Sequence, residues 1–420
     1  MQIDIGNIEI MAPAGNFESL MAALQGGAHS VYFGVGHLNM RAKSTVNFTI
    51  HDLPQIVEIC DKKNVKTYLT VNTVLYDSDL DSMRKTIDAA SKAGISAIIA
   101  SDQAAIMYAR EQNVEVHLST QLNISNSESL KFFSKWADVA VLARELNLEQ
   151  VSKISSNIIK DNITGPSGNR VRLEMFVHGA LCMAISGKCY LSLHQANASA
   201  NRGACIQICR RSYNVTDNET GEQLEVDNEY IMSPKDLCTI GFLNKILAAG
   251  VTVLKIEGRA RSPEYVKTVT RCYKEAVDSI AKGTYNDEAI QGWLGQLRKV
   301  FNRGFWDGYY LGQELGEWSQ KYGSISTDRK VYVGMVTNYF SNLGVVEVMP
   351  QASTLYENDK ILIIGPTTGV IEAKAEDIRV DHKSVKECSK GLKCSFKIPQ
   401  LVRRNDKLYR IVEATNFELK

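Results

Sequence analysis

Short apolar runs rich in Val, Ile and Tyr alternate with stretches of helical period along roughly the first 280 residues. This alternation is typical of parallel βα units. Eight strands are predicted, at residues 8–12, 30–34, 66–72, 97–101, 114–120, 139–143, 172–178 and 252–257. Eight such units favour a (β/α)8 TIM-like barrel. An open α/β sheet is the alternative, although no Gly-rich dinucleotide loop follows the first strand.

Residue types at the expected helix ends support this reading. Gly26-Gly27, Gly94 and Gly250 precede predicted strands, where glycine suits the left-handed end of a helix. Ser and Asp residues suited to N-capping predict helix starts near Asp52, Ser78, Ser125 and Ser233, and a longer helix is predicted at 263–281.

The repeat is interrupted by a long segment at residues 179–232, between the seventh strand and the helix predicted from Ser233. A connection of this length is usually functional. It follows the carboxyl end of a strand, which is the face where (β/α)8 barrels build their active sites.

Beyond the barrel the βα alternation gives way to short alternating strands, so three parts are predicted. They are the barrel with its Cys-rich insertion at 1–283, a helical and linker segment at 284–329, and a small all-β barrel domain at 330–420. The predicted strands of the all-β domain are 330–337, 343–348, 360–364, 371–378, 393–398 and 407–411. The runs GVVEV at 344–348, ENDKILIIGPTTGVIEAKAEDIRV at 357–380 and RRNDKLYRI at 403–411 resemble the second-domain barrel of translation factors, a module that often touches RNA. By spacing alone, a generic β-barrel or sandwich fits as well.

Composition narrows the class of protein. With 44% hydrophobic and 23% charged residues, the 420-residue chain has the composition of an ordinary soluble globular protein. Because its net charge is only +1, any nucleic acid would have to bind at a local basic patch. Without an apolar run of eighteen residues or a signal-like N-terminus, we expect no membrane span and a cytoplasmic location. Nine cysteines, an odd number, favour reduced thiols over a disulfide framework.

The strongest chemical signal is a set of four cysteines in the interrupting segment, Cys182, Cys189, Cys205 and Cys209, spaced C-x6-C-x15-C-x3-C. Four thiolates can hold a tetrahedral zinc or a [4Fe-4S] cluster. The absence of the C-x2-C knuckles common in structural zinc sites favours the cluster, and plain packing is a further alternative. Cys238, expected on the following helix, could replace one ligand. The remaining four are expected to pack in the core: Cys60, Cys272, Cys388 and Cys394.

Charged residues at two strand ends are the candidate acid–base groups. Glu174 and His178 alternate with Phe176, so the three are expected on one face of the seventh strand, and Lys255 and Glu257 on one face of the eighth. Together they offer proton donors and acceptors at one barrel mouth. A buried ion-pair network is the alternative for Glu174 and Lys255. His178 could also be a structural histidine or orient a metal ligand.

A candidate anion site follows the last strand at Arg259 and Arg261, where such barrels commonly bind phosphates or carboxylates. Arg144 and Arg202 are expected to join them, unless these arginines are solvated surface residues. Further strand-end groups could orient a base or a carboxylate: Asn72, Gln121, Asp102 and Ser119.

Four sequence stretches resemble the collagenase-like peptidase family U32. They are EMFVHGALCMAISGKCYLS at 174–192, NRGACIQICRRSY at 201–213, VLKIEGRARSPEYV at 253–266 and MAPAGNFESLMAALQGGAHSVYFG at 11–34. The likeness covers residues 8–281. It implies a peptidase by name, yet members of the family are oxygen-independent hydroxylases: a tRNA uridine hydroxylase that takes its hydroxyl from prephenate, an rRNA cytidine hydroxylase, and a ubiquinone-ring pair that carries iron-sulfur clusters.

The resemblance implies specific roles. The C-terminal barrel is most similar to that of the tRNA enzyme, which forms 5-hydroxyuridine at the wobble position, so we expect tRNA as the partner, prephenate at the arginines and a cluster on the cysteines. The ubiquinone members leave Cys209 and Cys238 as alternatives for the fourth ligand. Candidate RNA contacts are Arg210, Arg211, Arg403 and Arg404, with Tyr213, Tyr309 and Tyr310 to stack a flipped base.

Two other functions remain open from the sequence. A peptidase would use Cys182 as its nucleophile and His178 as the base. A non-enzymatic RNA-binding module would hold zinc at the cysteines.

Overall fold

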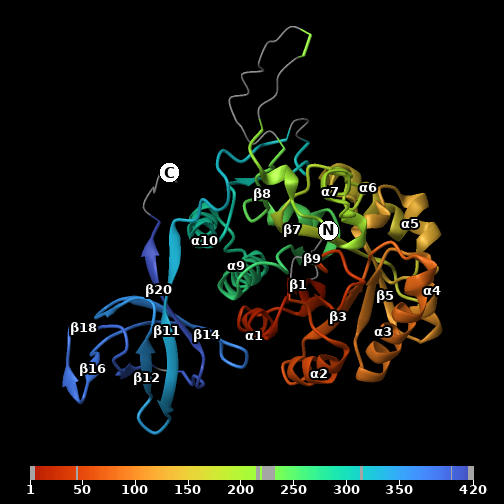
Figure 1. The fold of residues 1–420 in the computed structure, drawn as a ribbon. Helices are drawn as coiled ribbons and strands as arrows, with labels where there is room; N and C mark the ends of the chain where they lie inside the picture. The colour runs from red at the N-terminus through yellow and green to blue at the C-terminus, as the bar shows by residue number, and fades with distance from the viewer. Residues whose placement is uncertain are drawn as a thin grey trace.

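The computed structural model describes residues 5–43, 46–213, 218–219, 232–312, 316–398 and 400–414. Figure 1 shows an α/β body formed by the N-terminal and central parts of the chain, with a separate β domain from the C-terminal part beside it.

The α/β body is a closed barrel of eight parallel strands, which confirms the predicted (β/α)8 fold. Each strand pairs with the next, and β9 pairs with both β7 and β1 to close the ring. The barrel strands are β1 (Glu9–Pro13), β2 (Ser30–Gly34), β3 (Lys66–Val71), β4 (Ala97–Ala100), β5 (Glu115–Leu118), β6 (Val139–Val141), β7 (Arg172–Ala180) and β9 (Val251–Ile256). All eight coincide with predicted strands to within a few residues.

Helices cover the outside of the barrel. They are α1 (Phe17–Gln25), α2 (Leu53–Asp61), α3 (Leu80–Ala93), α4 (Gln103–Glu111), α5 (Ser127–Phe133), α6 (Leu148–Lys160), α8 (Leu243–Ala248) and α9 (Pro263–Lys282), with α10 (Asp287–Lys299) packed on α9. Local chemistry sets their ends: Asn16 caps α1 by accepting from the Ser19 amide, and Gly94 ends α3 in the left-handed conformation. No helix in the described ranges is both long and apolar enough to span a membrane.

The helix predicted from Ser233 is wrong. Residues 236–238 form a short strand, β8 (Asp236–Cys238), which pairs antiparallel with β7 and parallel with β10 (Phe305–Trp306). The Ser233 carbonyl accepts from the Ser319 amide, so distant segments take the backbone groups that a helix would use. Cys238 therefore lies on a strand. Two other predicted starts shift by two residues, since α3 begins at Leu80 and α5 at Ser127.

Residues 181–213 of the inserted segment are largely irregular. Their regular pieces are α7 (Leu191–Ala196) and two single 3-10 turns, Ala200–Arg202 and Ile208–Arg210. In Figure 1 the described part that contains α7 lies over the end of the barrel at which β7 and β8 are labelled.

The C-terminal part is an antiparallel β domain, as predicted, with a hydrophobic core of its own. Its larger sheet has the strand order β15-β14-β20-β11-β12-β19-β16-β17, and β13 pairs with β18. The strands are β11 (Asp328–Phe340), β12 (Val345–Pro350), β13 (Leu355–Tyr356), β14 (Lys360–Gly365), β15 (Gly369–Lys374), β16 (Arg379–Val380), β17 (Lys383–Ser384), β18 (Glu387–Cys388), β19 (Cys394–Lys397) and β20 (Lys407–Glu413).

The β14–β15 hairpin fixes this domain to the barrel. Gln25 of α1 donates to the Thr368 carbonyl (2.8 Å) and accepts from the Val370 amide (2.9 Å). Lys267 of α9 donates to the Val370 carbonyl (2.9 Å). Leu362, Ile364 and Val370 pack into the core of the barrel rather than into that of the β domain.

Candidate functional site

A pocket opens at the carboxyl ends of the barrel strands, between the strand-end loops and the inserted segment. Its floor includes Tyr32, Phe176 and Lys255, and residues 180–187 form one wall. The cations that line it are Arg41, Arg144, Arg210, Lys255, Arg259, Arg261 and Arg303. Glu257 is the one carboxylate among the described lining residues, so the pocket is suited to anions.

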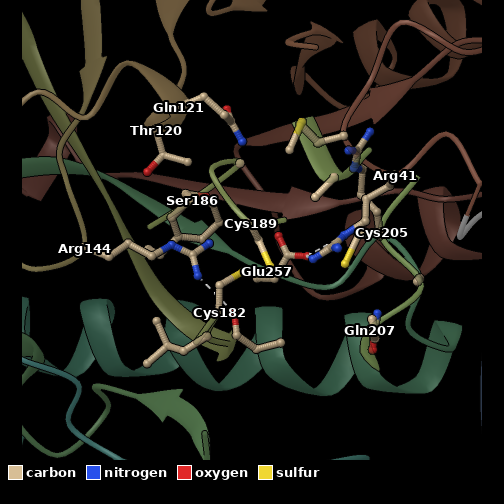
Figure 2. A pocket seen from close by; sticks show the side chains of 18 of the residues that line it. Arg41, Thr120, Gln121, Arg144, Cys182, Ser186, Cys189, Cys205, Gln207 and Glu257 are labelled. Carbon is tan, nitrogen blue, oxygen red and sulfur yellow. Dashed lines mark hydrogen bonds and ion pairs between the residues drawn. The ribbon is translucent and has the colours of Figure 1, made fainter. Parts of the chain in front are cut away.

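Glu257 stands at the centre of the arginines. Arg41 donates to its Oε1 from Nη2 at 2.7 Å and from Nε at 3.2 Å. Burial would raise the pKa of Glu257, but Arg41, Arg144 and Arg259 lower it to about 2. Figure 2 shows this carboxylate between Arg41 and Arg144. Glu257 therefore stays ionised near neutral pH and orients Arg41 rather than donating a proton.

Arg259 is 5% exposed and has only neutral partners. Its Nη1 donates to Thr70 Oγ1 (2.9 Å) and Asn39 Oδ1 (3.1 Å), and no described carboxylate lies within ion-pair distance. Burial lowers the pKa of Arg259 to about 10. Gly34 permits the arrangement, because a Cβ there would lie 2.7 Å from Arg259 Nη1. A buried guanidinium without a carboxylate is suited to a ligand carboxylate or phosphate.

Below the pocket floor, charged side chains fill part of the barrel interior. Lys255 donates to Glu174 Oε1 (2.7 Å), and His117 Nδ1 lies 3.4 Å from Glu174 Oε2. Burial would raise the pKa of Glu174, but Lys255 and His117 hold it below its usual range. Lys255 lines the pocket, whereas Glu174 does not. The geometry thus matches the ion-pair alternative for these two residues.

His178 does not enter the pocket. The β7–β9 register shifts between Phe176 and His178, so the expected sharing of one face by Glu174, Phe176 and His178 fails. The His178 ring packs against Tyr265 and Tyr273 of α9, with centroids 6.0 and 5.6 Å away. Burial, together with Arg261, lowers the pKa of His178 to about 3, so it is neutral at physiological pH.

The four cysteines of the inserted segment all line this one pocket, and none is in a disulfide. Figure 2 shows Cys182, Cys189 and Cys205 reaching into it beside Glu257. No group of three or more His, Cys, Asp or Glu among the described residues is close enough to hold a single metal ion. Zinc needs thiolates about 2.3 Å from one point. A four-iron cluster is broader than one ion, so thiols spread around a cavity fit it better.

Cys238 lies apart from this set. It is buried on β8 beside His178, does not line the pocket, and burial raises the pKa of its thiol to about 12. Of the two alternatives for the fourth ligand, Cys209 is the one that the structure brings to the pocket.

The predicted polar groups that follow β3 and β5 meet at the pocket wall. Asn72 donates to Ser119 Oγ (3.2 Å) and Gln121 Oε1 (3.3 Å), and Ser119 is hydrogen-bonded to Gln121. All three line the pocket. Asp102 instead caps α4 by accepting from the Ala104 amide.

The structure divides the predicted arginines. Arg144 and Arg261 line the pocket, and Arg144 lies 3.8 Å from the Phe176 ring centroid. Arg261 is held near Asp236 (4.0 Å) and over the Phe301 ring. Arg202 is outside the pocket, because it pairs with Asp79 and stacks on Tyr76, which corrects its assignment to the anion site.

The candidate RNA residues also differ in their exposure. Arg211, Arg403 and Arg404 are exposed. Arg210 is held by the Ser233 hydroxyl and the Pro234 carbonyl. Tyr310 is buried and donates to the Phe176 carbonyl (2.8 Å), so its ring is not available for stacking.

Sequence reasoning missed Arg41, the nearest cation to Glu257, and Arg303. Arg41 lies seven residues beyond the end of β2, so a search restricted to residues directly after strands does not reach it. Counting cations over the whole loop after each predicted strand would have included it.

Comparisons with known proteins agree with the resemblance seen in the sequence. The profile of peptidase family U32 matches residues 15–320. A protein named collagenase from Porphyromonas gingivalis is 61% identical over 97% of this chain and 99% of its own length. The tRNA hydroxylation protein P1 of Bacillus subtilis is 33% identical over 85% of this chain and 83% of its own. The 23S rRNA 5-hydroxycytidine synthase of Escherichia coli is 31% identical over 76% of this chain and 47% of its own.

Proposed function

Because the chain belongs to peptidase family U32, we propose that it is an oxygen-independent hydroxylase that converts the wobble uridine of tRNA to 5-hydroxyuridine. Prephenate is the proposed hydroxyl donor, and a [4Fe-4S] cluster is the proposed cofactor. Two relatives named for RNA hydroxylation support this reaction, since they align with 85% and 76% of this chain at 33% and 31% identity.

The observation that carries the proposal is the cationic pocket. Arg259 and Arg144 offer planar forks to the two carboxylates of a compact dicarboxylate such as prephenate. Phe176, which lies under Arg144, and Tyr32 provide apolar faces for its ring. Glu257 keeps Arg41 in place and, as a carboxylate, disfavours an anion placed directly against it.

Cys182, Cys189, Cys205 and Cys209 would hold the cluster, because their thiols surround one cavity and have no disulfide partner. A bound cluster would supply a Lewis-acidic or one-electron redox centre beside the anion site. The residues of the chain itself would bind and orient the donor.

The overall exchange balances between base and donor. The C5–H of uridine becomes C5–OH, which is a two-electron oxidation of the base. The donor gives up that oxygen, so its C–OH carbon ends as C–H and takes the two electrons. The uridine must be flipped out of the RNA stack to enter the barrel mouth.

A collagenase-like peptidase is the second candidate, favoured by the 61% identical relative. The geometry offers it little support. The described pocket lining contains no histidine, and His178 packs among the aromatic rings of α9 instead of beside Cys182. An activated cysteine needs a base within hydrogen-bonding reach.

Nucleoside mass spectrometry of tRNA tests the proposal. We expect 5-hydroxyuridine to fall in cells that lack this protein and to return with the wild-type gene or with Arg202→Met, whose guanidinium lies outside the pocket. It should not return with Arg259→Met. Unchanged 5-hydroxyuridine would contradict the proposal, and hydroxylated rRNA cytidine or quinone precursors would then be measured.

A further inference from the structure

A second, smaller pocket lies on the other side of the wall formed by Leu181–Ser186. We call it the aromatic pocket and define it by Trp306, Tyr309, Gly316 and Trp318. It shares Arg144 and Cys182 with the cationic pocket, but Lys255, Glu257 and Arg259 line only the latter. A ligand here would sit beside the reaction site without filling it.

Three aromatic side chains converge on Gly316. A Cβ at this position would lie 3.6 Å from Trp306 Cη2, Trp318 Cζ2 and Tyr309 Oη. Trp306 and Tyr309 pack edge to face, with ring centroids 5.4 Å apart. Glycine therefore keeps open the space between the rings. Trp318 and Tyr309 are half-buried, so part of each ring can accept a stacking partner.

The aromatic pocket is lined by two charged residues, Arg144 and Glu145. Arg144 offers hydrogen-bond donors, and the adjacent Glu145, whose side chain is exposed, offers acceptors. A planar ring with donors and acceptors along its edge matches this arrangement, as a nucleobase does.

Charges near the two pockets favour a polyanion. Lys43, Lys188 and Arg211 are exposed around the inserted segment, and none of them has a carboxylate within 4.0 Å among the described residues. Such cations can bind the phosphates of an RNA backbone, whereas an uncharged collagen-like peptide has no group to pair with them. Aromatic grooves also bind proline-rich chains, so a peptide is the rival ligand for the aromatic pocket.

We propose that the aromatic pocket stacks one unpaired nucleobase of the tRNA anticodon loop, next to the base that reacts in the cationic pocket. The inference rests on the proposed function, because it takes tRNA as the substrate. It adds a recognition subsite whose rings tolerate different bases, since every base has a face that can stack.

The test is binding of a fluorescein-labelled anticodon stem–loop RNA to the full-length protein, measured by anisotropy without prephenate. The RNA is compared with versions that are abasic at the wobble position or at either neighbour, one at a time. Gly316→Leu fills the aromatic pocket. Gly316→Ala is the matched control, because its Cβ would make only ordinary contacts at 3.6 Å. Trp318→Ala and Trp318→Phe form an independent pair.

We expect one abasic replacement at a neighbour to weaken binding to wild type and to Gly316→Ala by roughly tenfold, the effect of losing one stacked base. The same replacement should have little effect in Gly316→Leu and Trp318→Ala, while Trp318→Phe should behave like wild type. Equal effects of every abasic site in all variants would overturn the subsite.

A collagen-like Gly-Pro-Pro repeat peptide is the rival probe. If Gly316→Leu abolishes binding of this peptide and leaves RNA binding unchanged, the aromatic pocket is a peptide site and the proposal fails. Base-dependent binding together with unchanged cellular 5-hydroxyuridine would support the subsite and refute the hydroxylation. Loss of 5-hydroxyuridine without any base-dependent binding would support the hydroxylation and refute the subsite.

Discussion

Replacement of Arg259 by methionine tests whether the cationic pocket is built for a ligand. In the free protein the guanidinium is buried against Thr70 and Asn39, without a carboxylate to balance its charge. Burial lowers its pKa to about 10, and a depression of that size corresponds to about 3 kcal/mol against the charged form. Burial of this charge therefore lowers the free energy of unfolding. An anion bound to Arg259 would offset that loss.

The substitution should leave no buried polar group without a partner. The Thr70 hydroxyl also donates to the Phe33 carbonyl (2.9 Å), and Asn39 Oδ1 also accepts from the Arg41 amide (3.1 Å). Replacing a buried charge with a packed apolar side chain is often stabilising by about 1–4 kcal/mol. We expect Arg259→Met to raise the free energy of unfolding by about 1–3 kcal/mol in the absence of ligand.

Urea unfolding with and without prephenate measures both effects. At a ligand concentration 100 times Kd, wild type should gain about 2.7 kcal/mol, whereas Arg259→Met should gain almost nothing. Arg202→Met, outside the pocket, should lose some stability and keep the full response to prephenate. The reasoning is refuted if Arg259→Met is less stable than wild type without ligand, or if prephenate stabilises both proteins equally.

Three further predictions concern the barrel interior and the cysteines. Lys255→Met should lower the free energy of unfolding in urea by about 3–5 kcal/mol, because it leaves the buried Glu174 carboxylate without its ion-pair partner. Adding Glu174→Leu should restore most of that stability. A double variant as unstable as the single one would argue against the ion pair. Burial alone would raise the pKa of Glu9, but Arg172 and His117 outweigh burial and lower this pKa to about 2. Ionised Glu9 therefore stabilises the folded protein fully above its unfolded pKa of 4.5, and this stabilisation is lost as the pH falls toward 2. Glu9→Gln should flatten thermal stability across that window, and an unchanged pH profile would contradict the assignment. Anaerobically purified Cys209→Ser should lose iron and sulfide while Cys238→Ser retains them, and the opposite result would make Cys238 the fourth ligand.

The barrel could be predicted because its signals are local. Each strand is a short apolar run beside helical periodicity, so the eight strands were found to within a few residues. The antiparallel β domain followed from alternation in the same way. The convergence of Asn72, Ser119 and Gln121 followed from topology, since the carboxyl ends of parallel strands meet at one face.

The errors arose where distant contacts outweigh local preference. Ser233 and Pro234 resemble a helix start, but pairing with the chain near Gly304 and Ser319 makes the segment extended. His178 leaves the expected face because the register shifts by one position beside Phe176, which alternation alone does not reveal. Arg202 was expected in the anion site, yet Asp79, more than a hundred positions earlier in the chain, captures it.

Oxygen-18 tracing tests the central claim most directly. Purified protein with its metal content intact is incubated without oxygen with tRNA and with prephenate labelled in its ring hydroxyl, and the nucleosides are analysed by mass spectrometry. The proposed function predicts 5-hydroxyuridine carrying the heavy oxygen, formed by wild type and not by Arg259→Met. Absence of 5-hydroxyuridine, or product with oxygen drawn from water alone, would contradict it.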